Sequence, residues 1–183
     1  IVDVKERIQG TFAVNSEKIT KDFYAGFKKE HKAFADFITG IDDHMATKDN
    51  RNKQWYTSVM LNRLMFCYFI QKKGFLDNNK NYLQDKLKWV RKEQGEDRFF
   101  QTFYKGFLSD LFHDGLNAPR HDEAFERKYG RIPYLNGGMF DEHQLERDYA
   151  DIDICDEAFI RLFKQFPVLL LTDFKLIFFT CQG

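Results

Sequence analysis

The chain has 183 residues, which is enough for one domain with a hydrophobic core of its own. Its 28 Lys and Arg residues balance 28 Asp and Glu residues, which excludes a basic footprint for nucleic acid over the whole chain but not a local basic patch. Aromatic residues form 17% of the sequence and include 21 Phe, a composition typical of a packed globular protein and not of a disordered one.

Few residues in the sequence break helices, since there are only 11 Gly and 3 Pro, and this favours a mainly helical fold. The cysteines Cys67, Cys155 and Cys181 are far apart and form no CxxC pair, so neither a disulfide framework nor a zinc knuckle is predicted. We therefore expect a reducing, cytoplasmic setting. No apolar run reaches about 18 residues, so no membrane span is expected, and the charged start of the chain excludes a signal peptide.

The first expected helix follows an N-terminal appendage of residues 1–15. Ser16 or Thr20 could cap it, and Gly40 is expected to end it. Its apolar side chains recur at steps of three, four and seven residues, which places them on one helical face. These side chains are Phe23, Phe27, Phe34, Phe37, Ile38 and Ile41.

The second expected helix runs from about Arg51 to Lys73. Residues 59–70 read VMLNRLMFCYFI, which is apolar nearly all round and typical of the buried centre of a helical bundle. Lys72 and Lys73 followed by Gly74 form a helix stop, because cations favour the negative helix end and glycine tolerates the left-handed conformation.

A third helix is expected after the turn at residues 77–81, up to an interruption at 93–97. A fourth helix carries a broad apolar face from Phe99 to Phe112 and is expected to end at Gly115.

A long ordered loop is expected near residues 113–155, with one short helix at 122–129. A last helix follows at 156–166, and the chain then changes character. Residues 167–183 form an apolar, β-prone tail that we expect to be extended and prone to association. The predicted fold is thus mainly α, a helical bundle around a central apolar helix, with a domain at 16–166.

Catalytic motifs are missing from the sequence. It contains no GxGxxG or GxxxxGK[ST] phosphate cradle, no GxSxG elbow and no HExxH, and its five histidines never fall at metal-ligand spacing. Asp110, Glu126 and Lys128 could imitate the acid, acid-x-Lys pattern of magnesium nucleases. We favour a solvated helix face for them, because that pattern normally lies on strands and the FERK stretch is expected to be helical.

Several polar side chains lie on the central helix. Asn62, Arg63 and Gln71 must find partners if they are buried, because an unsatisfied buried group costs about 1–3 kcal/mol. Arg63 either bridges a carboxylate or a loop carbonyl, which we favour, or points into a nucleic-acid groove. Lys72 and Lys73 either stabilise the helix end, which we also favour, or bind phosphate.

The stretch GRIPYLNGGMF, residues 130–140, combines loop chemistry with core-like side chains. Pro133 restricts the backbone, and Asn136, Gly137 and Gly138 permit positive φ and close backbone approach. The side chains expected to anchor this loop to the bundle are Tyr134, Leu135 and Phe140. A rigid, anchored loop could wedge between domains or position a ligand.

Four motifs in order, KITKDFYAGFKKE, LNRLMFCYFIQKKGFL, FYKGFLSDLFHDGLN and GRIPYLNGGMFDEHQLE, resemble one family. It is the helical region of type IIG restriction–modification enzymes and related DNA adenine methylases, and the resemblance covers residues 17–166. It implies a helical connector between an N-terminal nuclease domain and a C-terminal methyltransferase domain. The catalytic motifs of both domains would lie outside this chain.

The resemblance therefore carries over no catalytic, cofactor-binding or metal-binding residue, and the chain alone is predicted to be inactive. S-adenosylmethionine and magnesium are expected only for the parent enzyme. DNA, bound weakly, and the neighbouring nuclease and methyltransferase domains are the expected partners, with no membrane. The candidate positions for contact with DNA or a neighbouring domain are Arg63, Lys72, Lys73, Arg131, Tyr134, Asn136, Gly137 and Gly138.

The tail departs from this family, which usually continues in a polar, acidic style after the position of Phe166. We interpret the change as a shifted reading frame near Phe166 or a truncated gene, and the start at Ile1 as a sign that the chain was cut from a longer one. The alternative function is a protein-interaction module without a DNA role, which could self-associate through 167–183.

Overall fold

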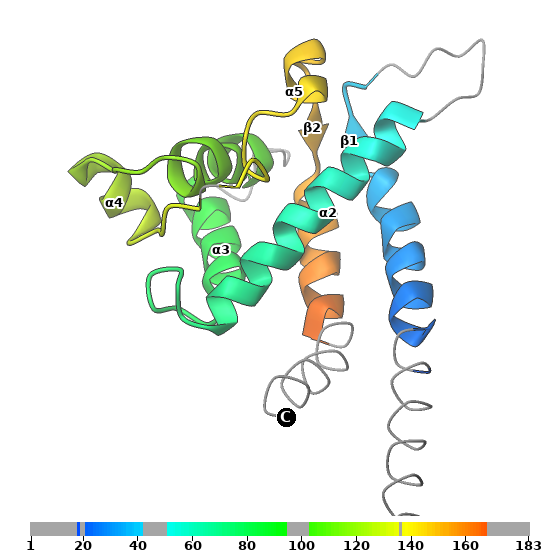
Figure 1. Ribbon diagram of the computed structural model, residues 1–183, viewed down its shortest axis with the longest axis horizontal. Coiled ribbons are helices and arrows are strands. Elements are labelled where there is room, and N and C mark those ends of the chain that lie inside the picture. The colour runs from blue at the N-terminus through cyan, green and yellow to red at the C-terminus, as the bar shows by residue number, and fades with distance from the viewer. Residues whose placement is uncertain (1–17, 19–20, 42–50, 95–102, 136, 168–183) are drawn as a thin grey trace, which may run out of the picture.

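The protein is described by a computed structural model that covers residues 18, 21–41, 51–94, 103–135 and 137–167 (Figure 1). It is mainly helical, as predicted. The labelled elements are β1 (Ile38–Thr39), α2 (Arg51–Lys72), α3 (Tyr82–Gln94), the π-helical stretches η1 (Tyr104–Leu108) and η2 (Leu111–Leu116), α4 (Glu123–Tyr129), α5 (Gln144–Asp148) and β2 (Asp153–Ile154). Residues 21–35 and 156–167 are also helical. The predicted appendage, residues 1–15, and residues 168–183 of the predicted tail lie outside the described residues.

Helix α2 crosses the molecule diagonally, in front of the helix over 156–167 (Figure 1). It is buried over a broad face that includes Met60, Leu64 and Cys67, which confirms the predicted central helix. Its last turn closes as predicted: the N–H of Gly74, at φ +80°, donates to the carbonyl of Gln71 at 2.9 Å. The helix is therefore the support against which the other elements pack.

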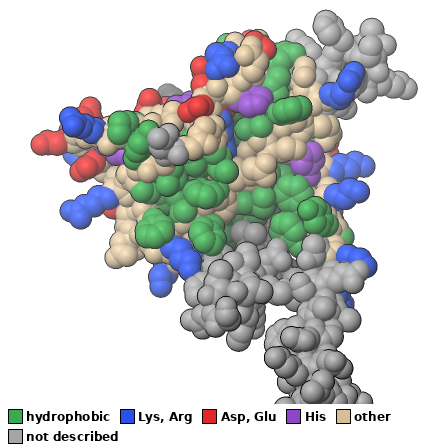
Figure 2. All heavy atoms as spheres, viewed as in Figure 1, with side chains coloured by type: hydrophobic (Ala, Val, Ile, Leu, Met, Phe, Trp, Pro, Cys, Tyr) green, Lys and Arg blue, Asp and Glu red, His purple; other side chains and the backbone are tan. Residues whose placement is uncertain are grey.

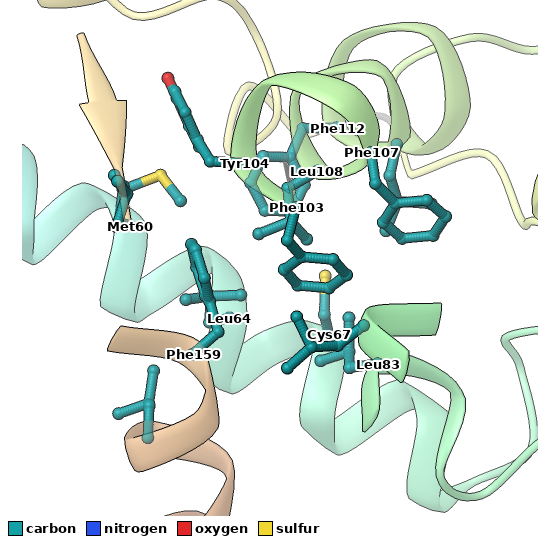
Figure 3. Close-up of a cluster of buried hydrophobic side chains, with 14 of the residues drawn as sticks. Met60, Leu64, Cys67, Leu83, Phe103, Tyr104, Phe107, Leu108, Phe112 and Phe159 are labelled. Atoms are coloured by element: carbon teal, nitrogen blue, oxygen red, sulfur yellow. The ribbon is translucent and has the colours of Figure 1, made fainter. Parts of the chain in front are cut away.

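The core is largely aromatic, which explains the abundance of Phe. Figure 3 shows side chains from α2, α3, the 103–116 segment and the helix over 156–167 meeting in one cluster. The Phe103 ring stacks on Phe107 with centroids 5.3 Å apart and meets the edge of Phe159 at 5.2 Å. Offset and edge-to-face pairs of this kind add about 0.5–1.5 kcal/mol beyond the burial of their area.

The helical segment over residues 103–116 contains π-helical turns that periodicity did not predict, and it ends at Leu116, one residue after the expected stop. Two backbone carbonyls in these turns accept hydrogen bonds from side chains. Lys128 Nζ donates to the carbonyl of Gly106 at 3.0 Å, and His121 Nε2 lies 2.8 Å from the carbonyl of Gly115. These bonds satisfy backbone groups in the wider turns, which form at the cost of regular α-helical pairing.

The prediction that the first helix continues to Gly40 is wrong. The helix over 21–35 ends earlier, and Ile38 then pairs with Ile154 in an antiparallel two-stranded sheet. Gly40 has φ +78°, and a Cβ there would lie 2.1 Å from the carbonyl oxygen of Asp151. The apolar spacing suggested a helix because local periodicity does not register a strand partner more than 100 residues away.

The later helices agree more closely with the sequence. Asp122 caps α4, since its Oδ1 accepts from the N–H of Phe125 at 2.7 Å, and α4 ends at Gly130 with φ +80°. The helix over 156–167 continues past its predicted end at Phe166 to Pro167, the last described residue. Helix α5 was not predicted, because five residues are too few to show a helical period.

Two further contacts fix the helix over 156–167. Arg161 pairs with Glu30 of the helix over 21–35 through two bonds, from Nε at 3.0 Å and from Nη2 at 3.2 Å. Asp156 Oδ1 accepts from the N–H of Phe103 at 3.0 Å, at the start of the 103–116 segment. None of the described helices has the length and apolar character needed to cross a membrane.

Candidate functional site

Arg63 is the largest fully buried side chain among the described residues, with 1% of its surface exposed. Its guanidinium reaches from the middle of α2 to the segment that follows α4. Nε donates to the carbonyl of Met139 at 2.9 Å, and Nη2 donates to the carbonyl of Asp141 at 2.6 Å. The plane also lies over the Phe112 ring, 5.4 Å from its centroid. The sequence left two roles for Arg63, a bridge to a carboxylate or loop carbonyl and a contact with a nucleic-acid groove. The structure shows the bridge, and the burial of Arg63 leaves it no access to a nucleic-acid groove.

The same guanidinium forms a buried ion pair with Glu146 of α5. Nη1 lies 2.8 Å from Oε1 and Nη2 lies 3.3 Å from Oε2, with 8% of the Glu146 side chain exposed. Glu146 Oε2 also accepts from the N–H of His143 at 2.7 Å, which closes the capping box that starts α5. One carboxylate thus serves both the ion pair and the helix start.

The pKa of Glu146 reflects two opposing effects. Burial would raise it, but the contact with His113, the Arg63 guanidinium and the N–H of His143 lower it to about 2. His113 Nε2 lies 3.4 Å from Oε2 of Glu146, although it makes no well-directed hydrogen bond among the described residues. The carboxyl group is therefore ionised at neutral pH, as a partner of the buried Arg63 must be.

Two tyrosines complete this network. The Tyr56 hydroxyl donates to Glu146 Oε1 at 2.9 Å and lies 2.5 Å from the Tyr104 hydroxyl. Burial raises the pKa of Tyr56, and the nearby Tyr104 and Glu146 raise it further. Burial also raises the pKa of Tyr104, to about 12. Both phenols therefore stay protonated and act as hydrogen-bonding groups rather than as bases. We call Arg63, Glu146, Tyr56 and Tyr104 the buried clamp.

The stretch after α4 is fastened at more than one point. The N–H of Asp77 donates to the carbonyl of Arg131 at 2.9 Å, and the N–H of Arg131 donates back to Asp77 Oδ1 at 3.1 Å. The N–H of Leu135 donates to the carbonyl of Leu116 at 2.7 Å. We call residues 130–143 the anchored loop. Phe140 is buried and Leu135 packs on the core, as predicted, whereas Tyr134 is 44% exposed.

The glycines of the anchored loop differ from each other. Gly138 has φ +68°, which confirms the expected positive φ. Gly137 is exposed, and a Cβ there would meet no atom within 4 Å, so the expected close backbone approach is wrong at this position. Asn136 lies outside the described residues. Neither glycine contacts another element closely, so contact with DNA or a neighbouring domain stays a prediction.

The other candidate residues lie at the surface and are not brought together with Arg63. Lys72 Nζ donates to Asn81 Oδ1 at 3.1 Å and lies 5.1 Å from the Tyr68 ring centroid. Lys73 Nζ lies 5.9 Å from the Phe69 ring centroid. These positions at the end of α2 agree with helix-end stabilisation. The side chain of Arg131 is exposed.

Two other polar residues of α2, Gln71 and Asn62, differ in burial. Gln71 is fully buried and paired: its Oε1 accepts from the N–H of Leu83 at 2.8 Å, and its Nε2 donates to Gln84 Oε1 at 3.1 Å. It therefore satisfies a donor at the start of α3. Asn62, in contrast, is exposed and needs no buried partner.

Two of the three nuclease-like residues are engaged with each other. Lys128 Nζ lies 3.3 Å from Asp110 Oδ2, and the Tyr129 hydroxyl donates to the same oxygen at 2.6 Å. Glu126 is exposed on α4. No group of three or more His, Cys, Asp or Glu side chains suited to a metal ion occurs within the described ranges. Asp110 and Lys128 therefore help to join α4 to the 103–116 segment.

A cleft that the sequence analysis missed lies between α3 and the helix over 156–167. Its volume is about 480 Å³. The lining residues are Gln84, Leu87, Lys88, Arg91, Lys92, Ile160, Phe163 and Lys164. Each helix alone showed an ordinary amphipathic pattern, so the sequence carried no signal that their basic residues would meet.

The sequence is 26% identical, over 159 aligned residues, to a protein of Methanocaldococcus jannaschii described as "Putative type II restriction enzyme and methyltransferase". The match covers 73% of this chain, whereas it spans only 13% of the length of that relative. No protein-family model matches the chain, and no solved structure matches it significantly. The similarity supports a relation to restriction–modification proteins.

Proposed function

We propose that this chain is a non-catalytic helical domain of a DNA restriction–modification protein, which spaces a nuclease domain from an adenine-specific methyltransferase domain and contacts the DNA backbone. The similarity to the M. jannaschii protein supports the general class. The observation that carries the spacing role is the buried clamp, in which one guanidinium joins the middle of α2 to the anchored loop and to α5.

The clamp suits a spacer because it resists bending between the parts that it joins. Arg63 makes bonds to three residues, Met139, Asp141 and Glu146, so the loop cannot slide along α2 without breaking several bonds together. Losing one partner would leave a buried charge unpaired, at a cost of about 3–5 kcal/mol. A domain held in this way transmits the position of one end to the other.

The catalytic part of the proposal is tested on the purified 183-residue chain, incubated with DNA and labelled S-adenosylmethionine, or with DNA and Mg²⁺. We expect neither methyl transfer nor strand cleavage, with an intact restriction–modification enzyme as the positive control. Genomic DNA on both sides of the coding sequence is expected to encode a nuclease upstream and a methyltransferase downstream, and a methyltransferase in the same frame would contradict a truncated gene. Measured methyl transfer by the pure chain would refute the proposal.

The spacing part is tested in the longer protein that carries this chain. Arg63→Ala should loosen the clamp and spread the positions of DNA cleavage relative to the recognition site, which are read from mapped cut ends. The matched control is Lys29→Ala, because Lys29 is exposed on the helix over 21–35. Cut positions that stay as narrow in Arg63→Ala as in the control would contradict a spacing role.

The second candidate function is a protein-interaction or self-association module. It is favoured by large hydrophobic side chains at the surface, among them Trp55 at 65%, Phe75 at 59% and Tyr24 at 62% exposed. Figure 2 shows hydrophobic side chains gathered over the middle of one face, with basic side chains toward its margins. Sedimentation at increasing concentration tests this function: association that disappears when residues 167–183 are removed supports it, and a monomer at all concentrations contradicts it.

A further inference from the structure

The cleft between α3 and the helix over 156–167 concentrates positive charge. Among the described residues, its lining includes Lys88, Arg91, Lys92 and Lys164 and no acidic side chain. All four of these side chains are exposed. The whole chain has a formal net charge of zero, so this cluster is a local excess and not a reflection of overall composition. A cleft lined by one sign of charge attracts ligands of the opposite sign.

Acidic side chains of the described residues do little to neutralise these four cations. Lys88 Nζ lies 3.8 Å from Asp85 Oδ1, but both side chains are at least half exposed, and such surface pairs contribute little. Arg91, Lys92 and Lys164 form no salt bridge with another described residue. Their charges are therefore available to a ligand.

The floor of the cleft is apolar and its walls are fixed. Leu87 and Phe163 are 5% and 6% exposed, and Ile160 lies beside them. Gln84 is held by Gln71 of α2, which also bonds to the start of α3. The opposite wall is held by the Arg161–Glu30 ion pair. A ligand would meet a preformed surface with basic edges and an apolar base.

We propose that this cleft binds the sugar–phosphate backbone of DNA. Lys88, Arg91 and Lys92 lie on one face of α3 and span about 6 Å of helix axis, a length over which one strand of a duplex places about two phosphates. Lys164 adds a fourth cation from the facing helix. The apolar floor suits deoxyribose. Gln84, the one amide among the described lining residues, already bonds to Gln71, so the proposed contact is with the sugar–phosphate backbone and not with the bases.

This inference rests on the proposed function only for the identity of the partner, DNA. It assigns the contact to residues that differ from the earlier candidates. Lys72 is the last residue of α2, Lys73 follows it, and Arg131 lies in the anchored loop. An acidic protein segment would also satisfy the charge of the cleft. It is the rival occupant that the experiment separates from DNA.

The test measures binding of the full 183-residue chain to a fluorescent 20-base-pair duplex by anisotropy, between 50 and 200 mM NaCl. Four phosphate contacts predict that log K falls with log salt at a slope of about −3.6, which weakens binding about 150-fold over this range. The variant Lys88→Glu/Arg91→Glu/Lys164→Glu should bind at least about tenfold more weakly at 50 mM and reduce the slope to about −0.9.

A matched control changes the same number of charges elsewhere. Lys28→Glu/Lys29→Glu/Lys32→Glu reverses three exposed cations on the helix over 21–35, which do not line the cleft. It should keep the wild-type slope. The conservative variant Lys88→Arg/Lys164→Arg should keep binding as well, and unfolding midpoints in urea identify any variant that has failed to fold.

Equal weakening by both triple reversals would overturn the inference, because binding would then follow net charge and not the cleft. Binding that does not change with salt would overturn it too. So would displacement of the duplex by a poly-glutamate peptide at lower concentration than by unlabelled DNA. The scaffold proposal is judged separately, by cleavage spacing in the longer protein, so a cleft that fails to bind DNA leaves that result intact.

Discussion

The buried clamp and the basic cleft both depend on cationic side chains, yet they use them in opposite ways. Arg63 is 1% exposed and bonds to one carboxylate and two carbonyls. The cleft cations Lys88, Arg91 and Lys164 are exposed and have no such set of partners among the residues that the structure describes. A buried charge must be paired, whereas a solvated one need not be. The Arg63 guanidinium therefore stabilises the fold, and the cleft cations remain available to bind a ligand.

Among variants of the buried clamp and the basic cleft, Arg63→Ala should lower the free energy of unfolding most. It would leave Glu146 ionised and buried without its main partner, so the free energy of unfolding should fall by about 3–5 kcal/mol. Urea denaturation at pH 7 measures it. The double variant Arg63→Leu/Glu146→Leu should cost less than the single one, because no charge is then stranded. A single-variant loss below about 1 kcal/mol would show that the clamp does not hold the fold.

The clamp also predicts a dependence of stability on acid pH. The pKa of Glu146 is about 2 in the folded protein, against an ordinary value of 4.5. A carboxyl group with a lowered pKa in the folded protein stabilises the fold at pH values above its pKa in the unfolded chain. Glu146 should therefore contribute about 3 kcal/mol to the free energy of unfolding above pH 5, and this contribution should be lost as the pH falls toward 2. Urea titrations of wild type and Glu146→Gln across this range should converge at the acid end. Parallel curves would contradict the lowered pKa.

A third prediction compares two glycines, one fixed by its surroundings and one free. Gly40 has φ +78°, and a Cβ there would lie 2.1 Å from the carbonyl oxygen of Asp151. Gly40→Ala should therefore lower the free energy of unfolding by at least about 2 kcal/mol. Gly137→Ala is the control, because a Cβ at Gly137 meets nothing within 4 Å, and it should change stability by less than about 0.5 kcal/mol. Equal losses of unfolding free energy in the two variants would show that the close backbone contact at Gly40, next to β1, does not stabilise the fold.

The smallest effect is expected in the cleft. Lys88→Ala, Arg91→Ala and Lys164→Ala should each change the free energy of unfolding by less than about 0.5 kcal/mol, because their side chains are solvated. Urea unfolding of each variant checks this. A loss above about 2 kcal/mol at any of them would place that residue with the clamp and break the contrast between the two regions.

The sequence predicted those parts of the fold that depend on neighbouring residues. Helix α2, the stop at Gly74 and the short helix α4 follow from apolar spacing and turn chemistry within a few residues. Helix α5 could not be found in this way, because it is short and its cap is His143, an unusual capping residue. The π-helical turns also leave no mark in a periodicity that assumes regular helices.

The candidate site was predicted only in part, and for a related reason. That Arg63 needs a partner follows from its place on an apolar helix, but the partner is Glu146, 83 residues further along the chain. Lys72, Lys73 and Arg131 looked as available as the cleft residues, because exposure cannot be read from the type of a residue. The cleft itself combines α3 with a helix that begins more than 60 residues after α3 ends.

The amino-acid order by itself determined where α2 forms and that it would be buried, because those properties arise from contacts within a turn or two. Only the tertiary structure decided which charged side chains are paired in the interior and which remain solvated at the surface. Pairing and burial depend on residues that are distant in sequence, and the free energy of a charge depends on what surrounds it more than on the side chain that carries it.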